Sequence, residues 1–389
     1  MNNYLPIHFL KTLGYGGLAV AFFMIPHAFF VGSHKGFPMA TFHHTTKYIS
    51  ETENILSIIL ILISIIGIIV FSFLHFKSLY SNLQKSKENK KIYQTQKGTN
   101  LEATIFAKPL AIAMSVNVGF IIGAMFIPNL HLIFEYLFPG AIIAFIMIGI
   151  WQIKLLNQKI NTMMNIDGNS TFDWNKTNNF ALLLIPFSFL MTAVGLAAPA
   201  AMSNILAIQT IGFISSLFFT LISTTMFAIL FISSVENIVK QGNFALSAGA
   251  TIWISVPIIT LLAIISIRLN HGLEVVFNTH NSSTGLLIVV VSFVLEIVIL
   301  LTGYLYLKRS DFLKMELDTE RLGANPSVYG LICPGVAFSV LTGLVAMFAT
   351  KTHLIQPYSI GWFIILIVWG IALYQTIKTL STLNKKYNI

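Results

Sequence analysis

The stretch VYGLICPGVAFSVLTGL, residues 328–344, is apolar enough to lie inside a membrane, yet Cys333-Pro334-Gly335 stands in its middle. Proline removes a backbone donor and clashes with the carbonyl one turn earlier, and glycine adds backbone freedom. A membrane helix with this sequence is expected to bend or break halfway across. Irregular backbone at membrane depth is tolerated where protein buries it or where it lines a watery cavity. The stretch therefore raises the question of what such a helix lines.

The composition places the whole chain in a membrane. Of its 389 residues, 56% are hydrophobic and only 10% are charged, and the mean hydropathy is +0.80. A soluble domain carries about a quarter charged residues, so this chain has too little polar surface for a water-soluble globule. The single cysteine, Cys333, excludes an internal disulfide and any Cys-rich metal or iron–sulfur site. We interpret the net charge of +9 as loops that face anionic lipid, and we expect no nucleic-acid partner.

Apolar runs of span length predict an all-α polytopic membrane protein. A spanning helix needs about 20 mostly apolar residues, and the sequence contains ten such runs. They are residues 9–32, 54–80, 109–131, 132–156, 178–202, 203–235, 246–268, 284–309, 328–350 and 358–384. The predicted organisation is an N-terminal tail (1–8), one transmembrane domain (9–384) with a solvated loop at 81–108, and a C-terminal tail (385–389). Very short turns near residues 128–129 and 199–203 join spans three to four and five to six as tight hairpins.

The distribution of Lys and Arg orients the predicted spans. Of the 23 basic residues, 19 lie in the two tails, in the loops after even-numbered spans or in the span ends beside them. The other four, Lys35, Lys47, Arg268 and Lys351, lie in or beside the loops after odd-numbered spans. The positive-inside rule then places both termini and the 81–108 loop in the cytoplasm, in a multi-pass protein of the cytoplasmic (inner) membrane. An even number of spans requires both termini on one side, which agrees with the charge bias.

Glycine and proline are unevenly shared between the spans. The odd-numbered spans hold 18 of these residues and the even-numbered spans nine, and for proline alone the ratio is seven to one. This alternation predicts five hairpins, each with a kinked odd helix inside and a regular even helix outside, around a central path. The alternative is that Gly and Pro serve close helix packing, as they commonly do in membranes.

This arrangement resembles the tellurite-resistance/C4-dicarboxylate transporter family, which includes the plant slow anion channels. The resemblance is one of architecture: ten spans with a cytoplasmic N-terminus, formed as five hairpins with kinked odd helices. It implies a pore enclosed by the inner helices, a homotrimer, and a phenylalanine plug on span nine just before a Pro or Gly break. The sequence departs from that pattern, because Cys333 precedes Pro334 and Phe338 lies five residues further on.

Candidate lining residues follow from the alternation and from the resemblance. Span nine contributes Cys333, a small residue at a narrow place, and Phe338, the nearest aromatic side chain. On a helix these two residues point about 140° apart and cannot both face the axis. Span three has no interior proline and centres on Asn117, Gly119 and Gly123. The amide of Asn117 either donates to an anion or forms an interhelical hydrogen bond. The lining or gate candidates are Cys333, Pro334, Phe338, Asn117, Gly119, Gly123, Pro26, Pro186 and Pro257.

Three charged residues lie in or beside the spans. Glu296 sits near the centre of span eight, where a carboxyl group either forms a structural hydrogen bond or carries protons. Arg268 ends span seven and either attracts anions or pairs with Glu274 or Glu135. Glu135 opens span four on the same side of the membrane. His27 is the only histidine well inside a span, so paired haem ligands are not expected.

These features predict a channel or transporter for small anions, without enzyme activity, cofactor or metal. The expected partners are the lipid bilayer, a small anion and further copies of the chain. Two alternatives remain: a proton-coupled secondary transporter of a small acid or sulfur compound with Glu296 as the proton carrier, and a membrane anchor subunit of a redox complex.

Overall fold

The chain is a multi-pass membrane protein built from helices. The computed structural model describes residues 5–30, 39–88, 100–164, 172–174, 177–277, 282–318 and 326–387. Within these residues ten helices are long and apolar enough to cross a membrane, which confirms the predicted number of spans. Residues 1–4 of the predicted N-terminal tail, 89–99 of the 81–108 loop and 388–389 of the C-terminal tail lie outside the described residues.

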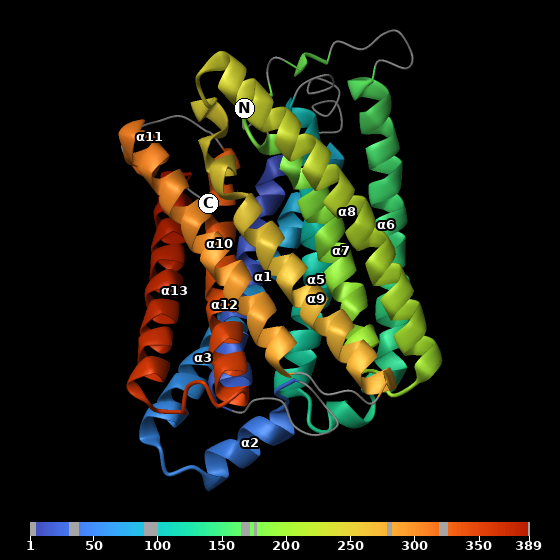
Figure 1. Ribbon diagram of the computed structural model, residues 1–389, viewed down its shortest axis with the longest axis vertical. Helices are drawn as coiled ribbons and strands as arrows, with labels where there is room; N and C mark the ends of the chain where they lie inside the picture. The colour runs from blue at the N-terminus through green and yellow to red at the C-terminus, as the bar shows by residue number, and fades with distance from the viewer. Residues whose placement is uncertain are drawn as a thin grey trace.

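The spanning helices are, in chain order, α1 (Phe9–Met24), which continues as a π-helical segment (Ile25–Phe30), then α3 (Ile55–Glu88), α5 (Ala107–Phe126), α6 (Phe134–Met163), α7 (Leu184–Met202), α8 (Leu206–Gln241), α9 (Ser255–Phe277), α10 (Ser282–Arg309), α12 (Ile332–Lys351) and α13 (Ile360–Lys386). Two short helices outside the bundle, α2 (Phe42–Glu51) and α11 (Phe312–Leu317), were not predicted. The two ends of the bundle are named below after these helices, since α2 lies at the bottom and α11 at the top of Figure 1.

Several helices are longer than their apolar runs. The sequence predicts a loop from residue 81, but α3 continues through Glu88, and the described end of that loop, Asn100–Phe106, is a 3-10 helix. The α8 helix likewise continues from the predicted end at residue 235 to Gln241. A helix does not stop where it leaves hydrocarbon, because its backbone hydrogen bonds continue until a residue such as Gly242, with φ of 66°, ends them.

Five helices pack in a closed ring at the centre of the bundle. Contacts join α1 to α5, α5 to α7, α7 to α9, α9 to α12 and α12 back to α1. The even-numbered spans pack on the outside: α3 on α1, α6 and α8 on α7, α10 on α9 and α12, and α13 on α12. In the most apolar window of each span, 50–89% of the residues are buried in the odd-numbered spans and 17–39% in the even-numbered ones.

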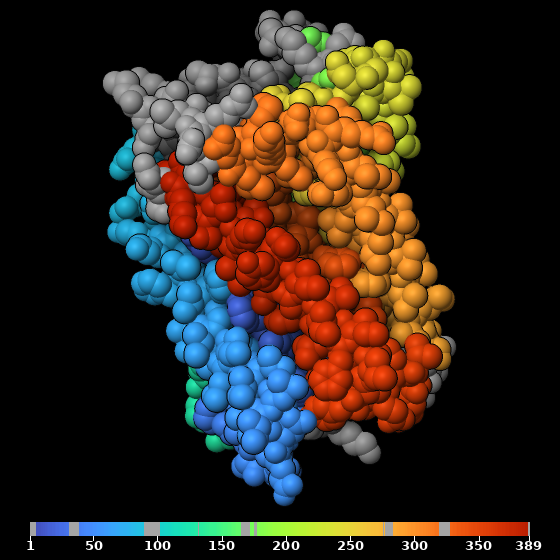
Figure 2. Space-filling view, turned by 90° about the vertical axis from the view of Figure 1, so that its left-hand side faces the viewer, coloured from blue at the N-terminus to red at the C-terminus, as the bar shows by residue number. Residues whose placement is uncertain are grey.

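The outer helices expose large apolar side chains. Ile66 of α3, Ile214 of α8 and Leu287 of α10 are each more than 60% exposed. Figure 2 shows one such face, where α3 and α13 cover the bundle and leave only a narrow strip of α1 in view. A continuous apolar surface of this kind fits contact with lipid tails rather than with water.

Serine side chains attach the outer helices to the inner ring. Ser64 of α3 donates to the Phe22 carbonyl at 2.7 Å, and Ser223 of α8 donates to the Pro186 carbonyl at 2.8 Å. Each hydroxyl is buried and satisfied by a neighbouring helix, as polar groups at membrane depth must be. These bonds fix the rotation of each outer helix against the inner one beside it.

Four inner helices carry proline at the same position. Pro109, Pro186, Pro257 and Pro334 are each the third residue of an α-helix, namely α5, α7, α9 and α12, and each of these helices follows a 3-10 segment. The N–H groups of a first helical turn have no partner within the helix, so proline there costs no helical hydrogen bond. The prolines therefore mark where 3-10 helix changes to α-helix.

This position corrects the expectation for span nine. Pro334 lies in the first turn of α12, after the 3-10 segment Pro326–Leu331, and does not interrupt a continuous α-helix halfway. Gly335 serves close packing, because a side chain there would collide with the Thr376 hydroxyl of α13. The irregular part of this span is its 3-10 beginning.

Candidate functional site

The inner ring encloses a cavity of about 360 Å³, called the central cavity below. Nearly all of its wall comes from α1, α5, α7, α9 and α12. On α12 the lining begins at Cys333, in the first turn, and ends at Lys351, the last residue. These residues are 18 positions apart, so the cavity follows the helix over about 27 Å, which is close to the thickness of a hydrocarbon core of about 30 Å.

Most of the wall is apolar. Methionine and phenylalanine contribute from every inner helix except α9, whose lining part is aliphatic and polar; examples are Phe23, Met24, Met114, Phe120, Met191 and Met347. Methionine is flexible and polarizable, so it adapts to ligands of different shape. A wall of this composition offers little to replace the hydration shell of an ion, so the few polar groups determine which ligands can enter.

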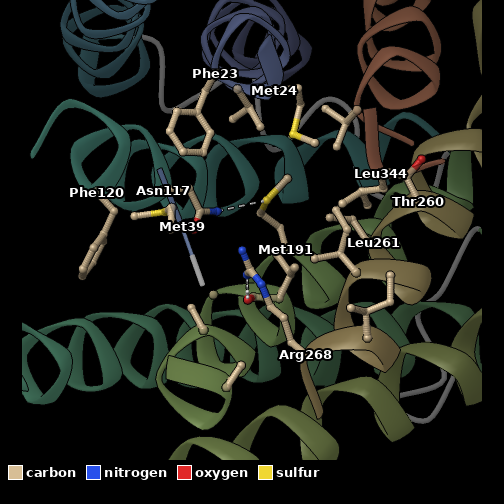
Figure 3. A pocket seen from close by; sticks show the side chains of 18 of the residues that line it. Phe23, Met24, Met39, Asn117, Phe120, Met191, Thr260, Leu261, Arg268 and Leu344 are labelled. Carbon is tan, nitrogen blue, oxygen red and sulfur yellow. Dashed lines mark hydrogen bonds between the residues drawn. The ribbon is translucent and has the colours of Figure 1, made fainter. Parts of the chain in front are cut away.

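Arg268 is the main charged group of the wall. It lies on α9 towards the α2 end, and its guanidinium points into the central cavity, towards Met191 and Asn117 (Figure 3). Its Nη1 donates to the Val194 carbonyl of α7 at 2.7 Å. Among the described residues no carboxylate pairs with it. The charge of Arg268 is therefore held by a neutral partner and is available to an anion.

The two proposed partners of Arg268 are bound elsewhere. Glu274 accepts a hydrogen bond from Asn270 at 2.7 Å and lies 3.9 Å from the Nδ1 of His271. Glu135 accepts from the Ser203 hydroxyl at 2.7 Å and from the Asn204 backbone N–H at 2.6 Å, so it ties the start of α6 to the α7–α8 turn. The expected alternative of an Arg268 ion pair with either residue is therefore wrong.

Further basic groups gather at the α2 end of the cavity. His27, in the π-helical segment, stacks on Phe23 with ring centroids 5.3 Å apart, and its buried Nδ1 has no hydrogen-bond partner among the described residues. Lys351, at the end of α12, also lines the cavity. The positive charges of Arg268 and Lys351 both lie near enough to His27 to interact with it electrostatically. Glu274 is the only carboxylate in the described lining. The electrostatic balance at this end favours anions.

Asn117 lies across the cavity from Arg268 (Figure 3). Its Nδ2 donates to the Met191 sulfur at 3.5 Å and so joins α5 to α7. A thioether is a weak acceptor, so an anion would be a better partner for this donor. The interhelical bond that the sequence suggested is present, and the amide still faces the cavity.

The predicted lining residues divide into two groups. Those that line the cavity are Cys333, Asn117, Pro257 and Arg268. The others have their side chains elsewhere: Gly119 is exposed, Gly123 packs on Leu130, and Pro26, Pro186 and Pro334 are buried between helices. Of the four candidate prolines only Pro257 lines the cavity, and Pro199 of α7, which was not a candidate, lines it too.

Phe338 does not face the cavity. It is half-buried and stacks on Phe293 of α10, with ring centroids 5.1 Å apart and planes inclined by 15°. The expectation that Phe338 is a gate is wrong, because its ring contacts an outer helix. The cavity-lining residues on either side of it in the sequence are Ala337 and Val340.

Glu296 lies behind the cavity wall rather than in it. Its side chain has no exposed area, and its Oε1 forms a hydrogen bond with the hydroxyl of Thr260, which lines the cavity. This outer-helix carboxyl group therefore faces the inner ring.

Sequence reasoning missed Thr260, Met191, His27 and Lys351 as cavity residues. For Met191 a usable signal was the spacing from the equivalent prolines of α5 and α7. Met114 and Met191 each lie five residues after their proline, and Asn117 and Val194 each lie eight after it. The same spacing on α9 and α12 leads to residues outside the described lining, so it does not identify Thr260, His27 or Lys351.

Among the described residues no group of three or more His, Cys, Asp and Glu side chains is placed to hold a metal ion. The comparisons with known proteins add no functional assignment: no protein-family model matches the chain, and no curated protein matches it.

Proposed function

We propose that the chain is a channel or transporter for small anions, which pass through the central cavity between the odd-numbered helices. The observation that carries the proposal is Arg268, a guanidinium in an apolar cavity whose one hydrogen-bond partner among the described residues is the Val194 carbonyl. A buried charge without a counter-ion is costly, and an anion in the cavity removes that cost. Arg268 is thus the primary anion contact, with Asn117 opposite it.

The length and lining of the cavity support a conducting path. It follows α12 for about 27 Å, and its basic groups gather at the α2 end. Cations placed at the mouth of a low-dielectric path raise the local concentration of anions there. The apolar remainder of the wall binds an anion weakly, which lets it leave after it has entered.

We further propose that the chain is similar in assembly to the tellurite-resistance/C4-dicarboxylate transporter family: five hairpins whose odd helices surround the path, a homotrimer, and no enzyme activity or cofactor. The ring of α1, α5, α7, α9 and α12 and the low burial of the even-numbered spans support this architecture. The family's phenylalanine plug has no counterpart on α12, since Cys333 stands at the matching place and Phe338 faces α10. Gating here would rely on other side chains.

The direct test is anion flux into liposomes that contain the purified protein, measured for chloride, nitrate, sulfite and succinate in turn. We expect flux of at least one of these anions above that of empty liposomes, and none of potassium or sodium. Protein that is correctly folded but passes none of the four anions would contradict the proposed function. Reversal potentials in salt and pH gradients separate a channel from a coupled carrier.

Orientation gives a separate prediction. In a Cys333→Ala background, Glu53→Cys lies at the α2 end and Lys87→Cys at the α11 end, and both positions are exposed. The distribution of Lys and Arg places the α11 end in the cytoplasm of cells that insert the protein in their inner membrane. A membrane-impermeant maleimide should therefore label Glu53→Cys in intact cells and Lys87→Cys only after permeabilisation.

The two possible failures of this labelling mean different things. Reversed labelling would overturn the proposed orientation and leave the bundle intact. Labelling of both cysteines from one side would contradict the arrangement of the spans, because Glu53 lies two residues before the start of α3 and Lys87 lies at its other end.

A further inference from the structure

Glu296 is a fully enclosed carboxyl group in the middle of α10. Its Oε1 is hydrogen-bonded to Thr260, while its Oε2 is buried and has no hydrogen-bond partner among the described residues. A carboxylate with one bare oxygen is very costly in an apolar interior, whereas a neutral carboxylic acid is tolerated. The site therefore suits a group that holds a proton.

In the described elements that pack on α10, no cation lies at the level of Glu296. Phe293 stacks on Phe338 and the Phe348 ring lies against Gly285, so α10 runs antiparallel to α12 and Glu296 is level with Gly335. The titratable group of α12 nearest that level is the neutral thiol of Cys333.

The other elements packed on α10 are α9, α11 and Leu246–Trp253. The last of these has no titratable residue, and the nearest one of α9 is Arg268, eight residues or about 12 Å beyond Thr260. The charged residues of α11 (Lys314 and Glu316) and of α10 itself (Lys308 and Arg309) lie at the α11 end, at least twelve residues or about 18 Å from Glu296. No positive charge among these groups is placed to compensate an ionised Glu296.

Thr260 connects this carboxyl group to the central cavity. Its side chain lines the cavity (Figure 3), and its Oγ1 is also 3.2 Å from the Val256 carbonyl. A hydroxyl has one hydrogen and cannot donate to both acceptors at once. When Glu296 is protonated, its O–H donates to Thr260 and Thr260 donates to Val256. When Glu296 is ionised, Thr260 turns its hydrogen to the carboxylate.

Gln152 shows how this fold makes a purely structural contact of the same kind. It is buried on the outer helix α6, where its Nε2 donates to the Ser188 carbonyl at 2.9 Å and its Oε1 accepts from Thr192 at 3.0 Å. The amide satisfies both of its polar ends with the inner helix α7. A structural bond between outer and inner helices thus needs no titratable group. Glu296, in contrast to Gln152, leaves one of its polar atoms without a partner among the described residues.

We propose that Glu296, behind the wall of the central cavity, and Thr260, in that wall, form a proton-binding site, and that an anion occupies the cavity when Glu296 carries its proton. The proposal rests on the proposed anion path. A proton added to the carboxylate changes its charge from −1 to zero, with no other bond made or broken. Loss of that proton places a negative charge beside the path, where low dielectric makes repulsion of an anion strong. Proton and anion therefore enter and leave together, and the protein is a proton-coupled carrier.

The test is uptake of chloride, nitrate, sulfite or succinate into liposomes, with the membrane potential clamped at zero and an inward proton gradient applied. We expect wild-type uptake to exceed uptake without the gradient by about tenfold, and to rise as the pH falls on both sides. Glu296→Gln mimics the neutral acid and keeps a hydrogen-bonding partner for Thr260. This variant should transport at the wild-type low-pH rate at every pH, with no response to the gradient.

Thr192→Val is the matched control, because it removes a buried bond between an inner and an outer helix that involves no titratable group. It should retain the wild-type response to pH. A Glu296→Gln protein that still responds to the gradient, or a wild-type flux that is independent of pH, would overturn the proton site while leaving the anion path intact. Absence of any anion flux in wild type would instead refute the proposed function.

A second pair of variants covers the case in which Glu296→Gln does not fold. Thr260→Val removes the one donor to the carboxyl group that the described residues provide, and Thr260→Ser keeps it. The midpoint of the pH profile should move by about half a pH unit or more in Thr260→Val and stay in place in Thr260→Ser. An unmoved midpoint in both would also overturn the proposal.

Discussion

Replacing Arg268 by glutamine is expected to lower anion flux about tenfold or more, which corresponds to about 1.4 kcal/mol of lost interaction with the passing anion. The guanidinium points into the central cavity, and among the described residues it has no carboxylate partner. Glutamine is uncharged and shorter, so it brings no positive charge into the cavity. Arg268→Lys keeps the charge without the forked geometry, so we expect its flux to lie between those of the other two proteins.

The control for Arg268 is Arg309→Gln, which removes one positive charge at an exposed position of the α11 end. It changes the net charge equally but does not touch the cavity, so its flux should equal that of wild type. Flux is measured in liposomes with matched amounts of monodisperse protein. Equal flux in Arg268→Gln and wild type would show that this side chain serves only to join α9 and α7.

Replacing Val340 by tryptophan is expected to block flux to the level of empty liposomes. Val340 is a cavity-lining residue of α12. An indole at this position extends into a space of about 360 Å³ that must stay open for an anion to pass. The effect is steric and should apply to every anion that the wild type passes.

Val345 provides the matched control on the same helix. It is half-buried and lies outside the described lining, so Val345→Trp adds the same bulk to α12 without filling the cavity. Its flux should remain close to that of wild type, with thermal unfolding measured for both variants to exclude misfolding. Undiminished flux in a folded Val340→Trp protein would place the path outside the central cavity.

The number of spans was predictable from the sequence alone, and the reason is physical. A hydrocarbon core admits only long apolar helices whose backbone groups are satisfied internally, so ten apolar runs of the right length imply ten helices. The ends of the helices were less predictable, as α3 and α8 show, because a helix continues into water for as long as its residues permit. The short α2 and α11 carry no apolar signal of span length and were missed.

The direction of each side chain on an inner helix depended on the tertiary structure. A helix that is apolar on all sides shows no stripe from which its inward face can be read. Phe338 and Val340 are both apolar residues of span nine, yet one stacks on Phe293 and the other lines the cavity. The packing of α10 against α12 separates them, and that contact joins residues far apart in the chain.

The charged residues show the same division. The sequence by itself identified Glu296 and Arg268 as groups that a membrane protein does not carry without a reason, because ionisable side chains at membrane depth are costly. Only the tertiary structure decided their partners: a hydroxyl of α9 for Glu296 and a backbone carbonyl of α7 for Arg268. The free-energy cost of burying an ionisable side chain depends on the residue and its depth in the membrane, which the local sequence determines. The partner that offsets this cost depends on which helices pack together, and that is determined when the ring of inner helices closes.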